Sequence, residues 1–178
     1  MKGIVFNLLE EIVSEEHGPE TWDALLDATE SNGSYTSLGN YPDAELLALV
    51  GAASTALDTP ADDLVRWFGR NAIPKFYERY PQLFDPHHTT SEFVVTLNDI
   101  IHPEVKKLYP GADPPEFDYH EVSESRVVMG YSSKRSLCAF GEGLLSGAGE
   151  HYGERIEIAR PMCVKRGDER CVFEVDIT

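Results

Sequence analysis

The chain has 178 residues, of which 42% are hydrophobic and 10% aromatic, so it can bury a sizeable core as one folded domain. Its 31 acidic and 15 basic residues give a formal charge of −16, which opposes binding to nucleic acid or to anionic membrane surfaces. Three cysteines cannot make a complete disulfide framework. The short apolar run at the N-terminus is soon broken by acidic residues, so we expect neither a signal peptide nor a membrane span, and a cytoplasmic protein.

The first sixty residues predict helices. Residues 3–16 carry apolar side chains at helical spacing, and Gly18 followed by Pro19 should end that helix. A short helix around Trp22 comes next, followed by a loop rich in glycine, serine and asparagine. A third helix is expected to open at Pro42. This part of the chain is therefore expected to be a purely helical lobe.

Two further helices are predicted in the middle of the chain. Thr59 is expected to cap the first of them and Pro60 to occupy its first helical position, while Pro74 should kink or break it. The second is expected to begin near Thr89 and to continue to Tyr109. A proline-rich connector then ends the helical region.

The last third of the chain predicts a mixed structure. The expected elements are strands at 116–122 and 126–129, a helix at 136–152, and strands at 154–159 and 171–177. The helix carries several glycines, which lower its propensity and can mark close approach by another element or by a flat ligand. The sequence thus predicts an α+β fold, with a helical first lobe and a second lobe around an antiparallel sheet of about four strands.

His102 is the first candidate functional residue. It lies beside an apolar stripe at helical spacing, formed by Leu97, Ile101, Val105 and Leu108. A neutral imidazole on a buried helix edge can be the single ligand of a metal or of haem iron. A lone histidine there is more often a hydrogen-bonded core or boundary residue, so from this stretch alone both interpretations stay open.

A second candidate site follows the second predicted strand. Tyr131, Ser133 and Arg135 occupy alternate positions of an extended segment and therefore point the same way. A phenol, a hydroxyl and a guanidinium together suit a carboxylate, because arginine can bind it bidentately and the hydroxyls add neutral donors. The alternative is a solvated strand edge.

Taken together, these residues resemble the H-NOX domains, the haem–nitric oxide/oxygen-binding domains of bacterial gas sensors and of soluble guanylate cyclase. The resemblance covers essentially the whole chain. It rests on the opening Met1-Lys2-Gly3, an axial histidine at His102, the Tyr-x-Ser-x-Arg motif at Tyr131, Ser133 and Arg135, and a porphyrin-contacting proline at Pro115.

The resemblance implies a single H-NOX domain over residues 1–178, with a helical lobe at 1–60 and a haem-ligating lobe at 61–178. Haem b would lie between the lobes, with His102 as the only protein ligand to iron. The Tyr-x-Ser-x-Arg motif would bind the propionates, and Val5 and Pro115 would distort the porphyrin.

Ligand selectivity in this family depends on the pocket on the open side of the iron. Members that bind oxygen stably carry a tyrosine there, and the matching position is Phe140, which has no donor. The other pocket positions that can be aligned are non-polar too, although each alone would be a plain core residue. They are Leu9, Ala72, Phe76 and Leu144.

A donor-free pocket implies a sensor of nitric oxide, with carbon monoxide as a further ligand, and not an enzyme. Nitric oxide would weaken the His102–iron bond, so that the helix of His102 could move. The partner would be a signalling protein such as a histidine kinase or a cyclic-di-GMP enzyme. The alternatives are an oxygen or thiol-redox sensor and, less favoured because no acid–base group is evident, a peroxidase-like haem enzyme.

The cysteines form the third candidate site. Some relatives carry a structural zinc bound by three cysteines and a histidine, in a His-x-x-Cys spacing. Cys138, Cys163 and Cys171 match the cysteines, but Arg160 stands where the histidine is expected. Because arginine cannot bind zinc, the sequence leaves open whether these residues hold zinc or are free thiols.

Overall fold

The computed structural model describes all residues from 1 to 178. The α-helices are α1 (Gly3–His17), α2 (Pro19–Thr29), α3 (Asp43–Leu57), α4 (Ala61–Arg79), α5 (Thr90–Val95), α6 (His102–Leu108) and α7 (Cys138–Tyr152). The strands are β1 (Glu116–Val122), β2 (Arg126–Ser132), β3 (Ile156–Met162) and β4 (Cys171–Ile177). None of the helices combines the length and the apolar character that crossing a membrane requires.

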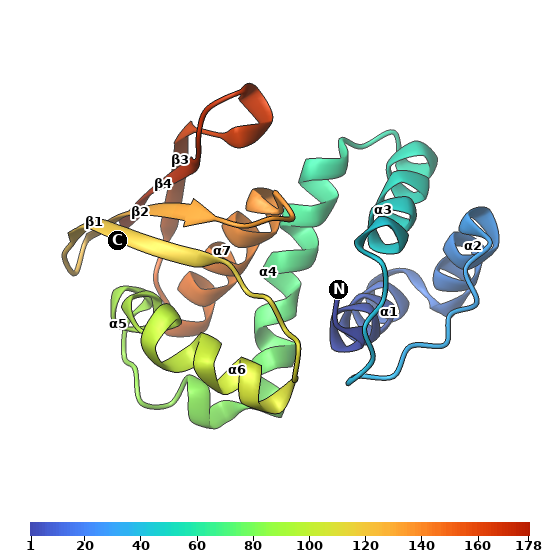
Figure 1. The fold of residues 1–178 in the computed structure, drawn as a ribbon, viewed down its shortest axis with the longest axis horizontal. Coiled ribbons are helices and arrows are strands. Elements are labelled where there is room, and N and C mark those ends of the chain that lie inside the picture. The colour runs from blue at the N-terminus through green and yellow to red at the C-terminus, as the bar shows by residue number, and fades with distance from the viewer.

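Helix α4 runs through the middle of the molecule (Figure 1). Helices α1 to α3 lie on one side of it, and the sheet with α5 to α7 lies on the other. Each side has its own apolar core. Phe68 and Ala72 of α4 belong to the core of the first side, whereas Ile73 belongs to that of the second. One helix therefore carries side chains of both cores.

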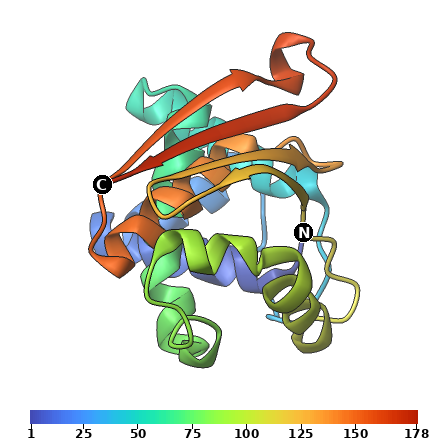
Figure 2. The same ribbon diagram turned by 90° about the vertical axis from the view of Figure 1, so that its left-hand side faces the viewer.

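The four strands form one antiparallel sheet in the order β1-β2-β4-β3. Figure 2 shows the sheet along one side of the molecule, with helices beneath it. Alternate residues of β2 and β4 are buried in the core shared with α4, α5 and α7, as a period of two requires. They are Val127, Met129, Tyr131, Cys171, Phe173, Val175 and Ile177. The sheet thereby aims Tyr131 inward, toward α7.

The glycines of α7 allow it to approach α4 closely. A Cβ atom added to Gly143 would lie 2.1 Å from the Arg66 carbonyl oxygen, and one added to Gly147 would lie 2.5 Å from that of Arg70. On α4, a Cβ at Gly69 would lie 2.5 Å from the carbonyl oxygen of Phe140. The prediction that these glycines mark close approach is therefore confirmed for a neighbouring helix. This packing fixes the position of Phe140 relative to α4.

The prediction of a single helix from Thr89 to Tyr109 is wrong in one respect, because in the structure this segment is divided into two α-helices and a π-helical turn. Helix α5 ends at Val95, a π-helical turn spans Leu97–Ile101, and α6 begins at His102. Pro103 has no N–H to donate to the carbonyl four residues earlier, which accounts for the change of hydrogen-bond pattern just before α6. The predicted start near Thr89 is confirmed, since α5 begins at Thr90 and the Glu92 N–H donates to Thr89 Oγ1.

The start of α4 also differs from the prediction. Pro60 is the residue before the first helical position, and the Thr59 hydroxyl donates to the Leu57 carbonyl instead of capping. Helix α4 continues through Pro74 without ending there. A proline removes one helical hydrogen bond, and the packing of α4 against both cores outweighs that loss.

The predicted strands are confirmed with shifts at their ends. Strand β2 continues to Ser132, three residues beyond the prediction, and β3 covers 156–162 instead of 154–159. The pairing of β3 with β4 shifts register between Ala159 and Met162. Helix α7 begins at Cys138, because Ser136 has a left-handed backbone with φ of 52°.

Candidate functional site

A cavity of about 300 Å³ lies where α1, α4, α6, α7, β1 and β2 meet. Of its 33 lining residues, 23 are hydrophobic, so the cavity suits a largely apolar ligand. Its polar lining residues include His102, Tyr131, Ser133 and Arg135, which the structure therefore brings together around one space. Pro115, Val5, Phe76, Phe140 and Leu144 line it as well.

Two of the predicted pocket residues lie elsewhere. Leu9 and Ala72 are buried in the first core and do not line the cavity. Ala72 has no exposed surface at all, and Leu9 is 6% exposed. They pack in the same core as Phe140 and Leu144 and so contribute to the cavity only through the positions of those residues.

His102 occupies the first position of α6 and is partly buried. Burial and the positive charge of Lys106 lower the pKa of its imidazole to about 4, so the ring is neutral at pH 7. The nearby backbone of Pro115 acts in the opposite direction and raises the pKa, but it does not outweigh burial. A neutral imidazole carries a lone pair on one ring nitrogen, as a metal ligand requires.

Phe117 and Asn98 support His102, although sequence reasoning passed over both. The ring of Phe117 stacks on the imidazole, with centroids 5.8 Å apart. The Asn98 side chain donates to the Phe117 carbonyl at 2.6 Å and accepts from the Phe117 N–H at 3.1 Å. Asn98 lies on the π-helical turn just before His102. In the sequence, the only indication of this support is that Asn98 is polar and lies about one helical turn before His102.

The Tyr-x-Ser-x-Arg residues converge at the end of β2. Tyr131 is 5% exposed, and burial raises the pKa of its phenol to about 12. Ser133 Oγ accepts from the Arg135 backbone N–H at 3.2 Å, which shapes the turn after the strand. With its hydroxyls and one guanidinium at the edge of an apolar cavity, this group can bind a carboxylate of a ligand that lies inside.

Asp43 faces the same guanidinium from α3. Its carboxylate lies 3.0 Å from Arg135 Nε and 2.6 Å from the amino group of Met1. Burial alone would raise the pKa of Asp43, but the hydrogen bonds from Met1 and Arg135 lower it below its ordinary value. Arg135 also donates to the Asp113 carbonyl at 2.6 Å. The side of the molecule formed by α1 to α3 is thereby connected to Arg135, which lies on the side of the sheet.

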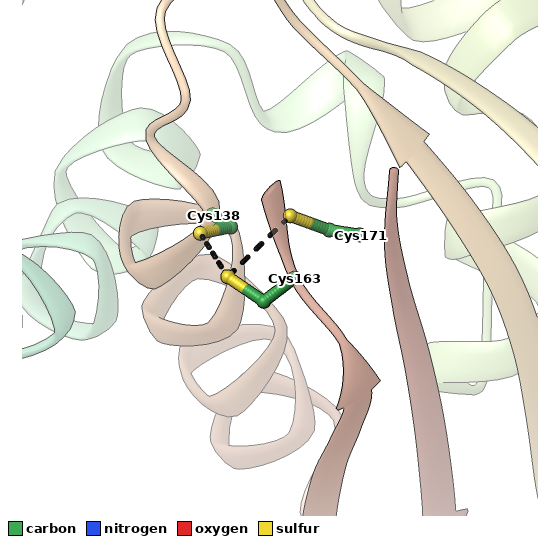
Figure 3. Close-up of side chains that lie close together, drawn as sticks. All are labelled: Cys138, Cys163 and Cys171. Carbon is green, nitrogen blue, oxygen red and sulfur yellow. Dashed lines mark hydrogen bonds between the residues drawn. The ribbon is translucent and has the colours of Figure 1, made fainter. Parts of the chain in front are cut away.

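The three cysteines come together (Figure 3), and none of them is among the residues that line the cavity. Cys138 begins α7, Cys163 follows β3 and Cys171 begins β4, and all three are fully buried. Arg160 lies on β3, with Nη1 3.2 Å from the carboxylate of Glu142. The structure thus assembles the three thiols, and the arginine that stands in the sequence position of the expected histidine pairs with Glu142 instead of offering a fourth donor.

One family model and three solved structures agree with this geometry. The family model described as Haem-NO-binding matches residues 2–160. An H-NOX protein from S. oneidensis, solved in the Fe(II)NO ligation state, has 30% sequence identity over 100% of this chain and 99% of its own, with a TM-score of 0.93. The unliganded Fe(II) H-NOX protein from K. algicida has 29% identity over 100% and 97% of the two chains, with a TM-score of 0.90. The H-NOX from Shewanella woodyi, solved with IWP-051 in the Fe(II)CO ligation state, has 34% identity over 99% and 94%, with a TM-score of 0.83.

Proposed function

We propose that this chain, which belongs to the haem-NO-binding family, the H-NOX proteins, is a sensor of nitric oxide. The fold of this family is a haem-binding gas-sensing fold. In our proposal the protein binds haem b in the 300 Å³ cavity and signals to a partner protein. The observation that carries the proposal is the cavity itself. One neutral imidazole, a carboxylate-binding group and apolar walls face a single space. The bound haem iron would supply the site at which a diatomic gas binds.

His102 would ligate the iron and be the only protein ligand. Its neutral state at pH 7 and the stack on Phe117 support that role. Tyr131, Ser133 and Arg135 would hold the propionates. Val5 and Pro115 line the cavity, which is consistent with contact to the porphyrin.

Selectivity for nitric oxide would come from the apolar lining. Phe140, Leu144 and Phe76 offer no hydrogen-bond donor to a polarised gas molecule. Oxygen needs such a donor for stable binding, whereas nitric oxide and carbon monoxide do not. In the relatives, the structures in Fe(II)NO and Fe(II)CO ligation states agree with gas ligands of this kind.

The output would begin at α6. We propose that residues 1–60 and 61–178 act as two lobes. Weakening of the His102–iron bond would free α6 to move within the second lobe and so change the angle between the two lobes. A gas can drive such a change only if it binds the two arrangements with different affinity. The partner would be a cytoplasmic histidine kinase or cyclic-di-GMP enzyme, and we assign no enzymatic activity to the chain itself.

The experiment that tests haem binding is a comparison of two histidine variants. His102→Ala should lose the spectrum of histidine-ligated ferrous haem and retain less haem after gel filtration. His151→Ala is the matched control, because His151 packs among Tyr77, Phe84 and Tyr152 outside the cavity. Equal spectra for both variants and the parent protein would rule out His102 as the iron ligand.

A further inference from the structure

The three thiols have the spacing of a partial metal site. Cys138 Sγ lies 3.8 Å from Cys163 Sγ, which lies 3.9 Å from Cys171 Sγ (Figure 3). All three sulfur atoms lie within 4.8 Å of one another. A tetrahedral zinc with Zn–S bonds of about 2.3 Å separates its sulfur ligands by about 3.8 Å. The cluster therefore has the dimensions of three corners of a zinc tetrahedron, and a fourth donor decides whether it is complete.

Arg160 stands at the sequence position where a histidine would supply that donor. Its side chain is 14% exposed and reaches Glu142, which lies one helical turn after Cys138 on α7. The guanidinium therefore lies beside the start of α7, where the thiols gather. Its Nε and Nη1 atoms are buried without a well-formed hydrogen bond. An arginine side chain has five donors, no acceptor and a permanent charge, so it cannot ligate zinc.

The Arg160 guanidinium is held by a carboxylate of α7. Glu142 is 8% exposed and pairs with Arg66 at 2.9 Å as well as with Arg160, so the arginine is held in place from α7. Cys163 Sγ lies between the other two sulfur atoms and accepts a hydrogen bond from Cys171 Sγ.

We propose that the cysteine cluster of this protein is metal-free and that the buried Arg160 guanidinium takes the place of a zinc ion as the cation beside the thiols. A second cation at that position would be repelled by Arg160, and three sulfurs alone leave a structural zinc site one ligand short. This departs from the zinc site that the cysteines would otherwise imply. The inference does not depend on haem binding.

The test is the zinc content of the parent protein and of two Arg→His variants. Protein expressed in zinc-supplemented medium is purified without a chelator or a polyhistidine tag, and zinc per chain is measured by mass spectrometry. The parent protein should carry no zinc above background, whereas Arg160→His should carry about one zinc per chain, because histidine supplies the missing donor. Arg66→His is the matched control, since Arg66 pairs with the same carboxylate from α4, and it should carry none.

Cobalt binding gives a second readout, and its result on the parent protein can be interpreted without the variants. Excess Co²⁺ added to the parent protein should produce no thiolate-to-cobalt charge-transfer absorption, while Arg160→His should produce it. About one zinc per parent chain that survives dialysis would overturn the proposal. So would a folded Arg160→His that takes up neither metal, because something other than the arginine would then exclude it. If Arg160→His does not fold, the zinc and cobalt results on the parent protein still decide whether the cluster is metal-free.

Discussion

The imidazole of His102 lies against the ring of Phe117, with the ring centroids 5.8 Å apart and the ring planes inclined by 28°. The partners of this stack are fixed from both sides. Asn98 binds the N–H and the carbonyl of Phe117, and the backbone of Pro115 lies near the imidazole of His102. The orientation of His102 is therefore set by strand β1 and its connector as much as by α6, so a shift of α6 must strain or release these contacts.

Replacing Asn98 tests this coupling. Asn98→Ala leaves the Phe117 N–H and carbonyl without their partner, which should cost about 1–3 kcal/mol of unfolding free energy. For a chain of this size we expect the melting temperature to fall by about 2–4 °C for each kcal/mol lost. Asn98→Asp keeps the acceptor for the Phe117 N–H and should lose less. Resonance Raman spectra of the ferrous protein should show a changed iron–histidine band in Asn98→Ala, and unchanged bands and melting temperature would contradict the coupling.

Asp43 is expected to weaken the hold of Arg135 on haem propionates. Because Asp43 already neutralises part of the guanidinium charge, Asp43→Asn should slow haem transfer to excess apomyoglobin by a few-fold, which corresponds to about 1 kcal/mol. Arg135→Ala should instead speed the transfer. If Asp43→Asn loses haem as fast as Arg135→Ala does, Asp43 positions the arginine and does not compete with the propionates.

The ion pairs of Glu11 predict a pH dependence of stability. Glu11 on α1 pairs with Lys75 at 3.2 Å and with Arg79, both on α4. Burial would raise the pKa of Glu11, but Arg79 and Lys75 lower it below the ordinary 4.5. Its contribution is therefore present above pH 4.5 and disappears as the pH falls through the lower value in the folded protein.

Thermal unfolding of Glu11→Gln beside the parent protein measures this contribution. At pH 7 the variant should be less stable by no more than about 1 kcal/mol, since the pairs are partly exposed. The difference between the two proteins should shrink steadily below pH 4.5. A difference that stays constant down to pH 3 would show that the charge of Glu11 contributes nothing.

The close approach of α4 and α7 predicts opposite effects at two helical glycines. Gly143→Ala places a methyl group against the Arg66 carbonyl and should destabilise the fold by about 1–3 kcal/mol, while also displacing Phe140. Gly51→Ala in α3 meets nothing within 4 Å and should stabilise it by up to about 1 kcal/mol. Melting temperatures compare the two directly, and a stabilising Gly143→Ala would contradict the close packing.

Local patterns predicted much of the fold because periodicity and caps act over a few residues. The ends of β1 and β4 and the start of a helix near Thr89 follow from such patterns. The division of the helix before His102 and the passage of α4 through Pro74 do not, because packing against the two cores decides them.

The candidate site shows the same limit. Motif spacing indicated Tyr131, Ser133 and Arg135, whose side chains share one strand and its turn. The spacing could not place Phe117 beside His102 or Asp43 beside Arg135, since 92 positions separate the latter pair and only the folded chain brings them together. Nor could it separate Leu9 and Ala72 from the cavity, because an apolar residue fits a core and a pocket wall equally well.

The measurement that tests the account most directly is the absorption spectrum of the ferrous protein, recorded alone, with nitric oxide, with carbon monoxide and in air. The position of His102 in the cavity predicts a histidine-ligated ferrous haem that gives distinct spectra with nitric oxide and with carbon monoxide. The apolar lining around Phe140 predicts that no stable spectrum of an oxygen complex forms in air. A stable oxygen complex would contradict the selectivity assigned to Phe140. Protein that retains no haem after reconstitution would contradict the assignment of the cavity itself.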